Sequence, residues 1–321
     1  MTGIGVLALV ALSPERVGAL TAAGYVVREG AKGASRLDAL RDAGDAVRAV
    51  LTNGRGGLSA DEMALLPNLE IVCATGAGYE AVDLGAARRR GIAVTNCPDA
   101  NAPAVADSAM MLLMAATRHL RHADRHVSAG GWQDAWRVDT PTISSKRLGI
   151  LGLGKIGSRI AHRAARGFDM EVGYHNRAAV AGSPYRYFPS LVALATWADF
   201  LVAAAPGGAG TRHLVNADVL AALGPKGYLV NVGRGTVVDT AALIDALRAK
   251  HIGGAGLDVL EGEPAVPPVL PELLAFDNVV VTPHVAGRAP ESRAASTALL
   301  LGNLDAHFAG RPLPSPVPLG S

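Results

Sequence analysis

The stretch that most constrains how this chain can fold is Lys146 to Gly157, which reads KRLGILGLGKIG and is followed by SRIA. A short apolar segment leads into three glycines, and a helix-like segment follows. In a dinucleotide-binding turn Gly152 allows the tight turn, Gly154 lets the backbone approach a pyrophosphate, and Gly157 permits close helix-on-strand packing. The phosphates would then lie at the N–H groups of the helix N-terminus. With 38 glycines in the chain, the triplet alone is a weak signal, but its strand–turn–helix context strengthens it.

Composition narrows the class of protein. The 321 residues are enough for two domains, and with 50% hydrophobic and 18% charged residues they predict large buried cores. A formal net charge of +2 gives no reason to expect nucleic acid or a membrane surface as a partner. No apolar run approaches the ~18 residues that a membrane span needs. Cys73 and Cys97 form neither a disulfide framework nor a metal-ligand pattern, so we expect a reduced, cytoplasmic setting and no metal.

The first hundred residues alternate between strand-like and helix-like segments, which predicts a parallel sheet with helices on both faces. Two glycine-bearing loops, 53–57 and 75–79, follow strands, where ligands bind in such sheets. Their N–H groups could hold an anion, although turn geometry alone also explains glycine there. Strands are expected at 4–10, 25–28, 46–51, 69–74 and 92–95, and helices at 14–22, 35–43, 59–66 and 84–90.

The second half begins with a very apolar helix, 102–119, which we expect to be buried between domains or between subunits. After the glycine-rich turn the alternation resumes, and a last helix is expected at 290–308. We therefore predict two doubly wound parallel-sheet domains, a dinucleotide-binding domain at 101–284 and a substrate-binding domain made of 1–100 and 285–321. Two chain crossings would join them as a hinge that closes on binding. The later strands are expected at 171–175, 200–204, 228–232, 254–259 and 279–282.

Candidate polar residues of the second half all fall at carboxyl ends of expected strands, so they should border one crevice. Each alone has an ordinary explanation, such as a helix-end salt bridge, a turn cap or a solvated loop acid. Together they include the arginine, acid and histidine that reduction of a 2-keto acid requires. They are Asn176-Arg177, Pro206 to Gly208, Arg234, Asp258, Glu263 and His284.

Four segments resemble the signatures of the D-isomer-specific 2-hydroxyacid dehydrogenases in order and spacing: 149–157, LVNVGRG at 229–235, GLDVLEGEP at 256–264, and TPH at 282–284. The likeness is strongest to the NADPH-dependent glyoxylate/hydroxypyruvate and hydroxyphenylpyruvate reductase branch, to which YHNR at 174–177 is similar. The resemblance implies a flavodoxin-like substrate domain and a Rossmann dinucleotide-binding domain. The chain departs from the family's usual sequence at Asp239-Thr240 and at Ala286-Gly287.

The resemblance also implies roles for individual residues. Arg234 would hold the carboxylate and keto oxygen of a small 2-keto or 2-hydroxy acid, His284 would be the acid/base, and Glu263 would support His284. The loop Gly76, Ala77 and Gly78 is similar to the family's carboxylate cradle. Trp136 matches a position that in some reductases reaches the neighbouring subunit's substrate pocket, which implies a homodimer with the long apolar helix in its interface.

The cofactor expectation rests on a missing acid. NAD-preferring sites place an acid about 20 residues past the turn to accept from the ribose 2′-hydroxyl, whereas this chain has Asn176 and Arg177 there. Asp169 and Glu171 would lie at the opposite end of that strand. Because Arg177 can pair with a 2′-phosphate, we expect NADP(H) to be preferred and NAD(H) to be a second cofactor; stacking of Arg177 on adenine is the alternative. The implied cofactor-binding residues are Gly152, Leu153, Gly154, Lys155, Ile156, Gly157, Asn176, Arg177, Ala205, Pro206, Val232, Gly233, Asp258 and Gly287.

A second class of function stays open at this level. The C-terminal-binding corepressors resemble the same fold and sense dinucleotides while acting through protein contacts. This chain shows no extended tails of the kind such regulators carry, which favours the enzyme. For Asp258, a turn cap is the alternative to a bond with the nicotinamide carboxamide.

Overall fold

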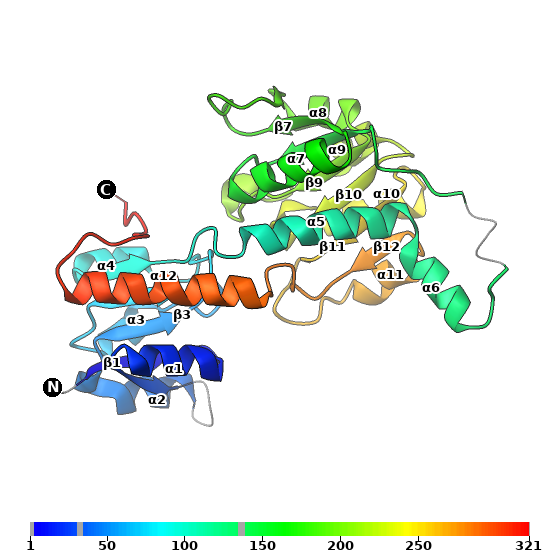
Figure 1. Cartoon of the computed structure of the whole chain (residues 1–321). Coiled ribbons are helices and arrows are strands. Elements are labelled where there is room, and N and C mark those ends of the chain that lie inside the picture. The colour runs from blue at the N-terminus through cyan, green and yellow to red at the C-terminus, as the bar shows by residue number, and fades with distance from the viewer. Residues whose placement is uncertain (1–2, 31–34, 134–138, 321) are drawn as a thin grey trace. The chain divides into compact units, whose positions relative to one another are not determined.

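The structure is a computed structural model that describes residues 3–30, 35–133 and 139–320. It divides into two compact units (Figure 1). Unit 1 comprises Met1–Asn101 together with Arg288–Ser321, and unit 2 is Ala102–Gly287. Unit 1 is therefore built from two stretches of chain that unit 2 separates in the sequence.

Unit 1 contains a five-stranded sheet in the order β2-β1-β3-β4-β5, and every pairing is parallel. This is the flavodoxin-like order, which confirms the predicted fold class. The strands are β1 (Ile4–Ala8), β2 (Tyr25–Glu29), β3 (Ala49–Thr52), β4 (Ile71–Ala74) and β5 (Ala93–Thr95).

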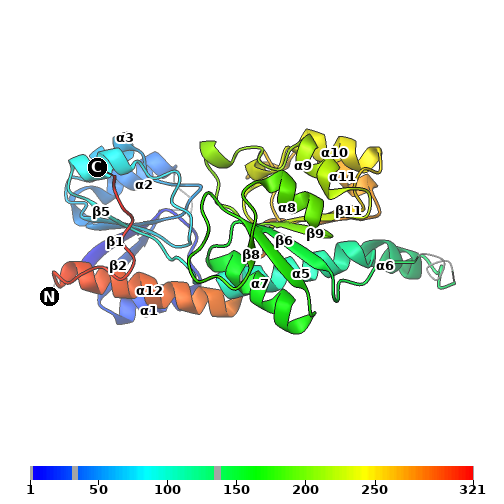
Figure 2. The same cartoon turned by 90° about the horizontal axis from the view of Figure 1, so that it is seen from above.

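Helices cover both faces of the unit 1 sheet because successive strand residues point to opposite sides. Val6, Leu51 and Ile71 pack in one core with helices α1 and α12, whereas Leu7 and Val50 pack in the other with α2, α3 and α4. Figure 2 shows α12 beside α1. The helices are α1 (Pro14–Ala22), α2 (Arg36–Ala43), the 3-10 turn η1 (Gly44–Ala46), α3 (Ala60–Ala64), α4 (Leu84–Arg89) and α12 (Pro290–Phe308).

Unit 2 contains a seven-stranded parallel sheet in the order β12-β11-β10-β9-β6-β7-β8. The order reverses between β6 and β9, as in a Rossmann domain, so the predicted fold class is confirmed here too. The sequence did not predict β8, because two residues carry no periodicity. The strands are β6 (Arg147–Leu151), β7 (Glu171–His175), β8 (Arg186–Tyr187), β9 (Phe200–Ala203), β10 (Tyr228–Asn231), β11 (Gly254–Leu257) and β12 (Val279–Val281).

One face of this sheet packs against α5 and α7, and the other against α8 to α11. The long apolar helix α5 was expected between domains or subunits, but its buried side packs within unit 2. A Cβ on Gly256 of β11 would come within 2.9 Å of Leu112 of α5, so only glycine permits this approach. The helices are α5 (Ala102–Thr117), α6 (Leu120–Ser128), α7 (Lys155–Gly167), α8 (Leu191–Trp197), α9 (Ala217–Leu223), α10 (Thr240–Arg248) and α11 (Leu270–Ala275), with 3-10 turns η3 (Ala209–Thr211) and η4 (Gly235–Val237).

Within the described residues, none of the helices is long and apolar enough to cross a membrane. The same part of the chain holds no group of three or more His, Cys, Asp or Glu side chains that could bind a metal ion. Cys73 and Cys97 are both free and buried.

Candidate active site

The glycine-rich turn joins β6 to α7 at the point where the strand order of unit 2 reverses. Gly152 has φ +97°, and a Cβ there would lie 2.9 Å from the backbone nitrogen of Ala205. A Cβ on Gly157 would lie 2.1 Å from the carbonyl oxygen of Gly152, whereas one on Gly154 would meet nothing within 4 Å. The turn is therefore closed on its protein side and open at Gly154, and α7 has no side-chain cap at that residue. This geometry fits a pyrophosphate at the helix N-terminus.

Asn176 follows β7 and braces this turn. Its Oδ1 accepts a hydrogen bond from the N–H of Leu153 at 2.7 Å, so its amide nitrogen is the atom that can donate to a ligand. Arg177 is exposed beside it, and Glu171 is the first residue of β7, at the strand's other end. Asn176 and Arg177, on which the expected cofactor preference rests, thus lie beside the glycine turn, whereas Glu171 lies at the other end of the strand.

The loop after β10 positions Arg234. Asn231, 1% exposed, donates from Nδ2 to the carbonyl oxygen of Arg234 at 3.0 Å and accepts from the N–H of Gly233 at 3.1 Å. A Cβ on Gly207 would lie 3.0 Å from Cγ of Arg234, so the loop after β9 contacts the arginine's stem. We did not expect a role for Asn231 from the sequence. Its position indicated one, because a polar side chain at the end of a fully buried strand needs hydrogen-bond partners.

Asp258 holds the turn after β12 in place through hydrogen bonds. Its side chain is buried, and Oδ1 accepts from the Thr282 hydroxyl at 2.6 Å and from the Val285 N–H at 2.9 Å. Oδ2 accepts from the N–H of Ala286 at 3.0 Å, and the Asp258 carbonyl accepts from the N–H of His284 at 2.8 Å. These bonds are those of the turn cap that the sequence left as an alternative; a bond to a carboxamide stays a prediction.

His284 and Glu263 form the central pair. Nδ1 of His284 lies 2.6 Å from Oε2 of Glu263, and because a carboxylate only accepts, Nδ1 carries the proton. Oε1 of Glu263 accepts from the N–H of Leu260 at 2.8 Å, so the carboxylate is fixed at both oxygens. His284 has φ +55°, a conformation that few non-glycine residues adopt. The hydrogen bonds to Asp258 hold the backbone in this conformation, as expected where a side chain must be positioned for function.

Unit 1 contains the loop 76–78, which we expected from the sequence to be a carboxylate cradle. The side-chain amide of Asn96 donates to the carbonyl of Ala77 at 2.7 Å, and the N–H of Cys97 donates to the carbonyl of Gly76 at 2.9 Å. Within the described residues, the N–H groups of Ala77 and Gly78 donate to no protein acceptor. A loop with its carbonyls engaged and adjacent amides available suits an anion. Trp136 lies outside the described residues.

The structure therefore gathers the glycine turn, Asn176, Arg234, Asp258, Glu263 and His284 at the carboxyl edge of the unit 2 sheet. A Rossmann sheet with a glycine turn at its switch point, an arginine and a carboxylate-paired histidine defines the class of NAD(P)-dependent oxidoreductases. Residues 110–286 match the family model for the NAD binding domain of the D-isomer specific 2-hydroxyacid dehydrogenases. The chain belongs to the D-isomer-specific 2-hydroxyacid dehydrogenase family, as its motifs predicted.

Known proteins resemble the chain over most of its length. It is 44% identical to glyoxylate/hydroxypyruvate reductase A HPR2 of Arabidopsis thaliana and 42% identical to hydroxyphenylpyruvate reductase of Plectranthus scutellarioides, in each case covering 85% of this chain and 86% of the relative. Among solved structures, the NADPH-dependent glyoxylate/hydroxypyruvate reductase of Sinorhizobium meliloti, in complex with NADP and malonate, has a TM-score of 0.85 and 36% identity, covering 98% of this chain and 97% of that chain.

Proposed function

We propose that this dehydrogenase reduces small 2-keto acids, namely glyoxylate, hydroxypyruvate or an aryl pyruvate, to D-2-hydroxy acids. The observation that carries the proposal is the 2.6 Å pair of His284 and Glu263 at the sheet edge that also bears Arg234. The reductase names of the relatives support it.

The chain's own residues supply binding and proton transfer. The planar guanidinium of Arg234 can hold a carboxylate and the keto oxygen together, which orients the carbonyl. With Nδ1 directed at Glu263, the other ring nitrogen of His284, Nε2, is the atom that would give a proton to the forming alkoxide. Glu263 accepts from Nδ1 and holds the ring's orientation. The reduced nicotinamide, when bound, supplies the hydride.

We assign the cofactor to unit 2. The turn from Gly152 to Gly157 would hold the pyrophosphate, and Asn176 with Arg177 the adenosine ribose and its 2′-phosphate. We propose NADPH preference because no carboxylate stands at the end of β7 and Arg177 is exposed there. The remaining residues assigned to the nicotinamide side are Ala205, Pro206, Val232, Gly233, Asp258 and Gly287.

Steady-state kinetics with glyoxylate, hydroxypyruvate and phenylpyruvate, each with NADPH and with NADH, test the proposal. We expect turnover with at least one acid and a lower KM for NADPH. A protein that binds NADPH without turning over any of the three would favour the dinucleotide-sensing, corepressor-like alternative.

The double variant Asn176→Asp with Arg177→Ala should weaken NADPH by roughly ten- to a hundredfold, fitting one lost charge-assisted contact, and leave NADH unchanged or improved. Arg186→Ala is a matched control, because it removes an exposed arginine of the same unit that stacks 4.6 Å from the ring centroid of Phe188. Equal losses for both cofactors in the double variant would contradict the assignment.

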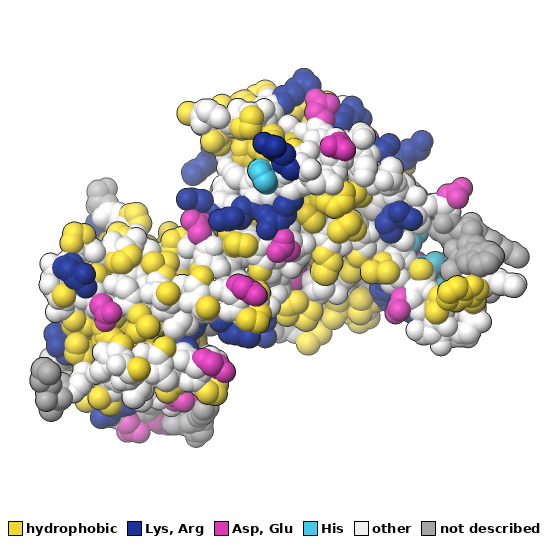
Figure 3. Space-filling view, viewed as in Figure 1, with side chains coloured by type: hydrophobic (Ala, Val, Ile, Leu, Met, Phe, Trp, Pro, Cys, Tyr) yellow, Lys and Arg dark blue, Asp and Glu magenta, His cyan; other side chains and the backbone are white. Residues whose placement is uncertain are grey.

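In unit 1 we assign the N–H groups of Ala77 and Gly78, with Gly76, to the substrate's carboxylate. We also propose a homodimer. Apolar side chains gather over α5 in Figure 3, and large ones remain exposed there and on α6: Met111, Met114, Leu120 and Val127. Light scattering coupled to size exclusion tests the dimer, and Trp136→Ala assayed for substrate KM tests the tryptophan. Two free, buried cysteines fit a cytoplasmic location.

A further inference from the structure

The loop 53–57 after β3 packs directly on the loop 76–82 of unit 1. A Cβ on Gly54 would lie 2.8 Å from the carbonyl carbon of Gly78, and a Cβ on Gly57 would lie 1.9 Å from the carbonyl oxygen of Ala81. The N–H of Ala81 donates to the carbonyl of Gly54 at 3.2 Å, and Leu58 forms a parallel bridge with Val82. The position of Gly78 therefore depends on the position of the loop 53–57.

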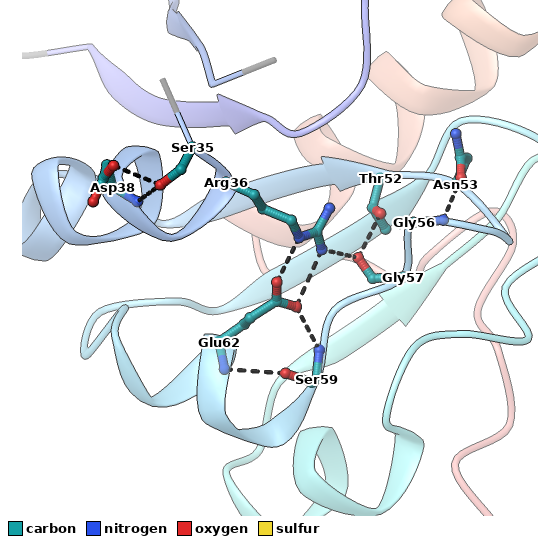
Figure 4. Close-up of polar contacts among 9 residues, drawn as sticks. All are labelled: Ser35, Arg36, Asp38, Thr52, Asn53, Gly56, Gly57, Ser59 and Glu62. Atoms are coloured by element: carbon teal, nitrogen blue, oxygen red, sulfur yellow. Dashed lines mark hydrogen bonds and ion pairs between the residues drawn. The ribbon is translucent and has the colours of Figure 1, made fainter. Parts of the chain in front are cut away.

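One carbonyl oxygen holds the loop 53–57 in place (Figure 4). The oxygen of Gly57 accepts from Nη2 of Arg36 at 2.8 Å and from the hydroxyl of Thr52, a fully buried residue, at 2.6 Å. The N–H of Gly57 donates to the carbonyl of Asn53 at 2.9 Å, and Oδ1 of Asn53 accepts from the N–H of Gly56 at 2.7 Å. Gly57 has φ +53°, so another residue type would be strained there.

Arg36 is itself oriented by Glu62. Nε of Arg36 lies 2.5 Å from Oε1 of Glu62 and Nη2 lies 3.1 Å from Oε2, a two-bond pairing whose side chains are 33% and 15% exposed. Glu62 also accepts from the N–H of Ser59 at 2.9 Å in the capping box of α3. The hydrogen bond from Arg36 is the largest cause that lowers the pKa of Glu62, so the acid stays charged near neutral pH.

We propose that Arg36 is a positioning residue for the carboxylate cradle: through Glu62 and the Gly57 carbonyl it fixes the loop 53–57, on which Gly78 rests. The inference depends on the proposed role of Ala77 and Gly78 in binding the keto acid. Lysine cannot replace arginine here, because it cannot hold both glutamate oxygens and the Gly57 carbonyl with one planar group.

The test compares Arg36→Gln and Arg36→Lys with Arg48→Gln. Arg48 precedes β3 and pairs with Glu70, which precedes β4, so the control breaks an ion pair at the opposite end of the same strands. We expect the KM for glyoxylate to rise on the order of tenfold in both Arg36 variants, since small misplacements of a binding group are costly, with the KM for NADPH unchanged. Arg48→Gln should leave both constants near wild type.

Gly54→Ala gives an independent variant that leaves Arg36 intact. Its methyl group would press on Gly78, so the KM for glyoxylate should again rise selectively. Hydrogen exchange should quicken at loops 53–57 and 76–82 in Arg36→Gln but not in Arg48→Gln. If the wild-type protein reduces no keto acid, the proposed function itself is rejected. If the wild type is active but the Arg36 variants keep its KM for glyoxylate, or if their KM values for glyoxylate and NADPH rise equally, only the inference about Arg36 is overturned.

Discussion

Among its described residues, unit 2 has two histidine–glutamate pairs, and the two glutamates lie in one loop. His284 contacts Glu263 at 2.6 Å and His213 contacts Glu261 at 2.8 Å, and both histidines have positive φ, +55° and +52°. They differ in the nitrogen that is engaged. His284 uses Nδ1, whereas His213 uses Nε2 and has its Nδ1 3.7 Å from Asp239. The ring of His213 lies between two carboxylates and joins loops, whereas Nδ1 of His284 faces Glu263 and its Nε2 is the atom that we propose for proton transfer.

The surroundings of Glu261 support a structural role for the second pair. Its Oε2 accepts from the N–H of Thr240 at 3.2 Å, at the start of α10, and Arg212 lies 3.6 Å from its Oε1. The pair thus connects the loops that follow β9, β10 and β11. The same two residue types are used once to brace an edge of the sheet and once, we propose, to move a proton.

The largest expected difference between the pairs is in turnover. His284→Ala should lower kcat by ~10²–10⁴-fold, the usual loss of a general acid, with little change in the Kd for NADPH. His284→Asn is the companion variant, because asparagine tolerates positive φ. His213→Ala should keep kcat within a few-fold of wild type. Stopped-flow and steady-state rates measure both, and equal losses in His284→Ala and His213→Ala would remove the distinction.

The two acids should also differ in their effect on keto-acid reduction. Glu263→Gln replaces the carboxylate that accepts from Nδ1 of His284, so the ring loses the charged partner that orients it and kcat should fall on the order of tenfold. Glu261→Gln should leave kcat/KM near that of wild type. Steady-state rates of both variants are the measurement; a kcat for Glu263→Gln equal to that of wild type would count against the catalytic pair.

The smallest expected effect is on stability. Burial acts to raise the pKa of Glu261, but the hydrogen bonds from His213 and Thr240 outweigh it, so the pKa is lowered overall. A lowered carboxyl pKa stabilises the fold above the unfolded value, about 4.3, and this stabilisation is lost as the pH falls through the folded value. The free energy of unfolding of Glu261→Gln, measured in urea at pH 7, should therefore be about 1 kcal/mol lower than that of wild type. A difference that persisted unchanged at pH 3 would show another origin.

Local signals made much of the fold predictable. Helices Pro14–Ala22 and Pro290–Phe308 were predicted with their observed bounds, because Ser13 caps the first and Pro290 opens the second. The family and its fold class followed from motif order. The strand at 171–175 was also predicted with its observed bounds, most other elements differ by a few residues, and β8 was missed.

The contacts of the site were less predictable, because they join residues far apart in the chain. Asp258 meets the turn at 282–286 only because β11 and β12 are neighbours in the sheet. The pairing of Arg36 with Glu62 joins two helices, and that of His213 with Glu261 joins the loops after β9 and β11. Sequence gives the residue types for such pairs but not which acid each base meets.

The division of unit 1 into two stretches of sequence has a consequence during synthesis. Residues 1–101 leave the ribosome with the sheet face of Val6, Leu51 and Ile71 only partly covered, by α1, since Leu300 and Leu304 of α12 complete that core. At roughly 5–20 residues per second, all of unit 2 is translated first, a delay on the order of ten to forty seconds. The nascent first stretch must therefore wait, with an apolar surface exposed to chaperones, until the chain returns.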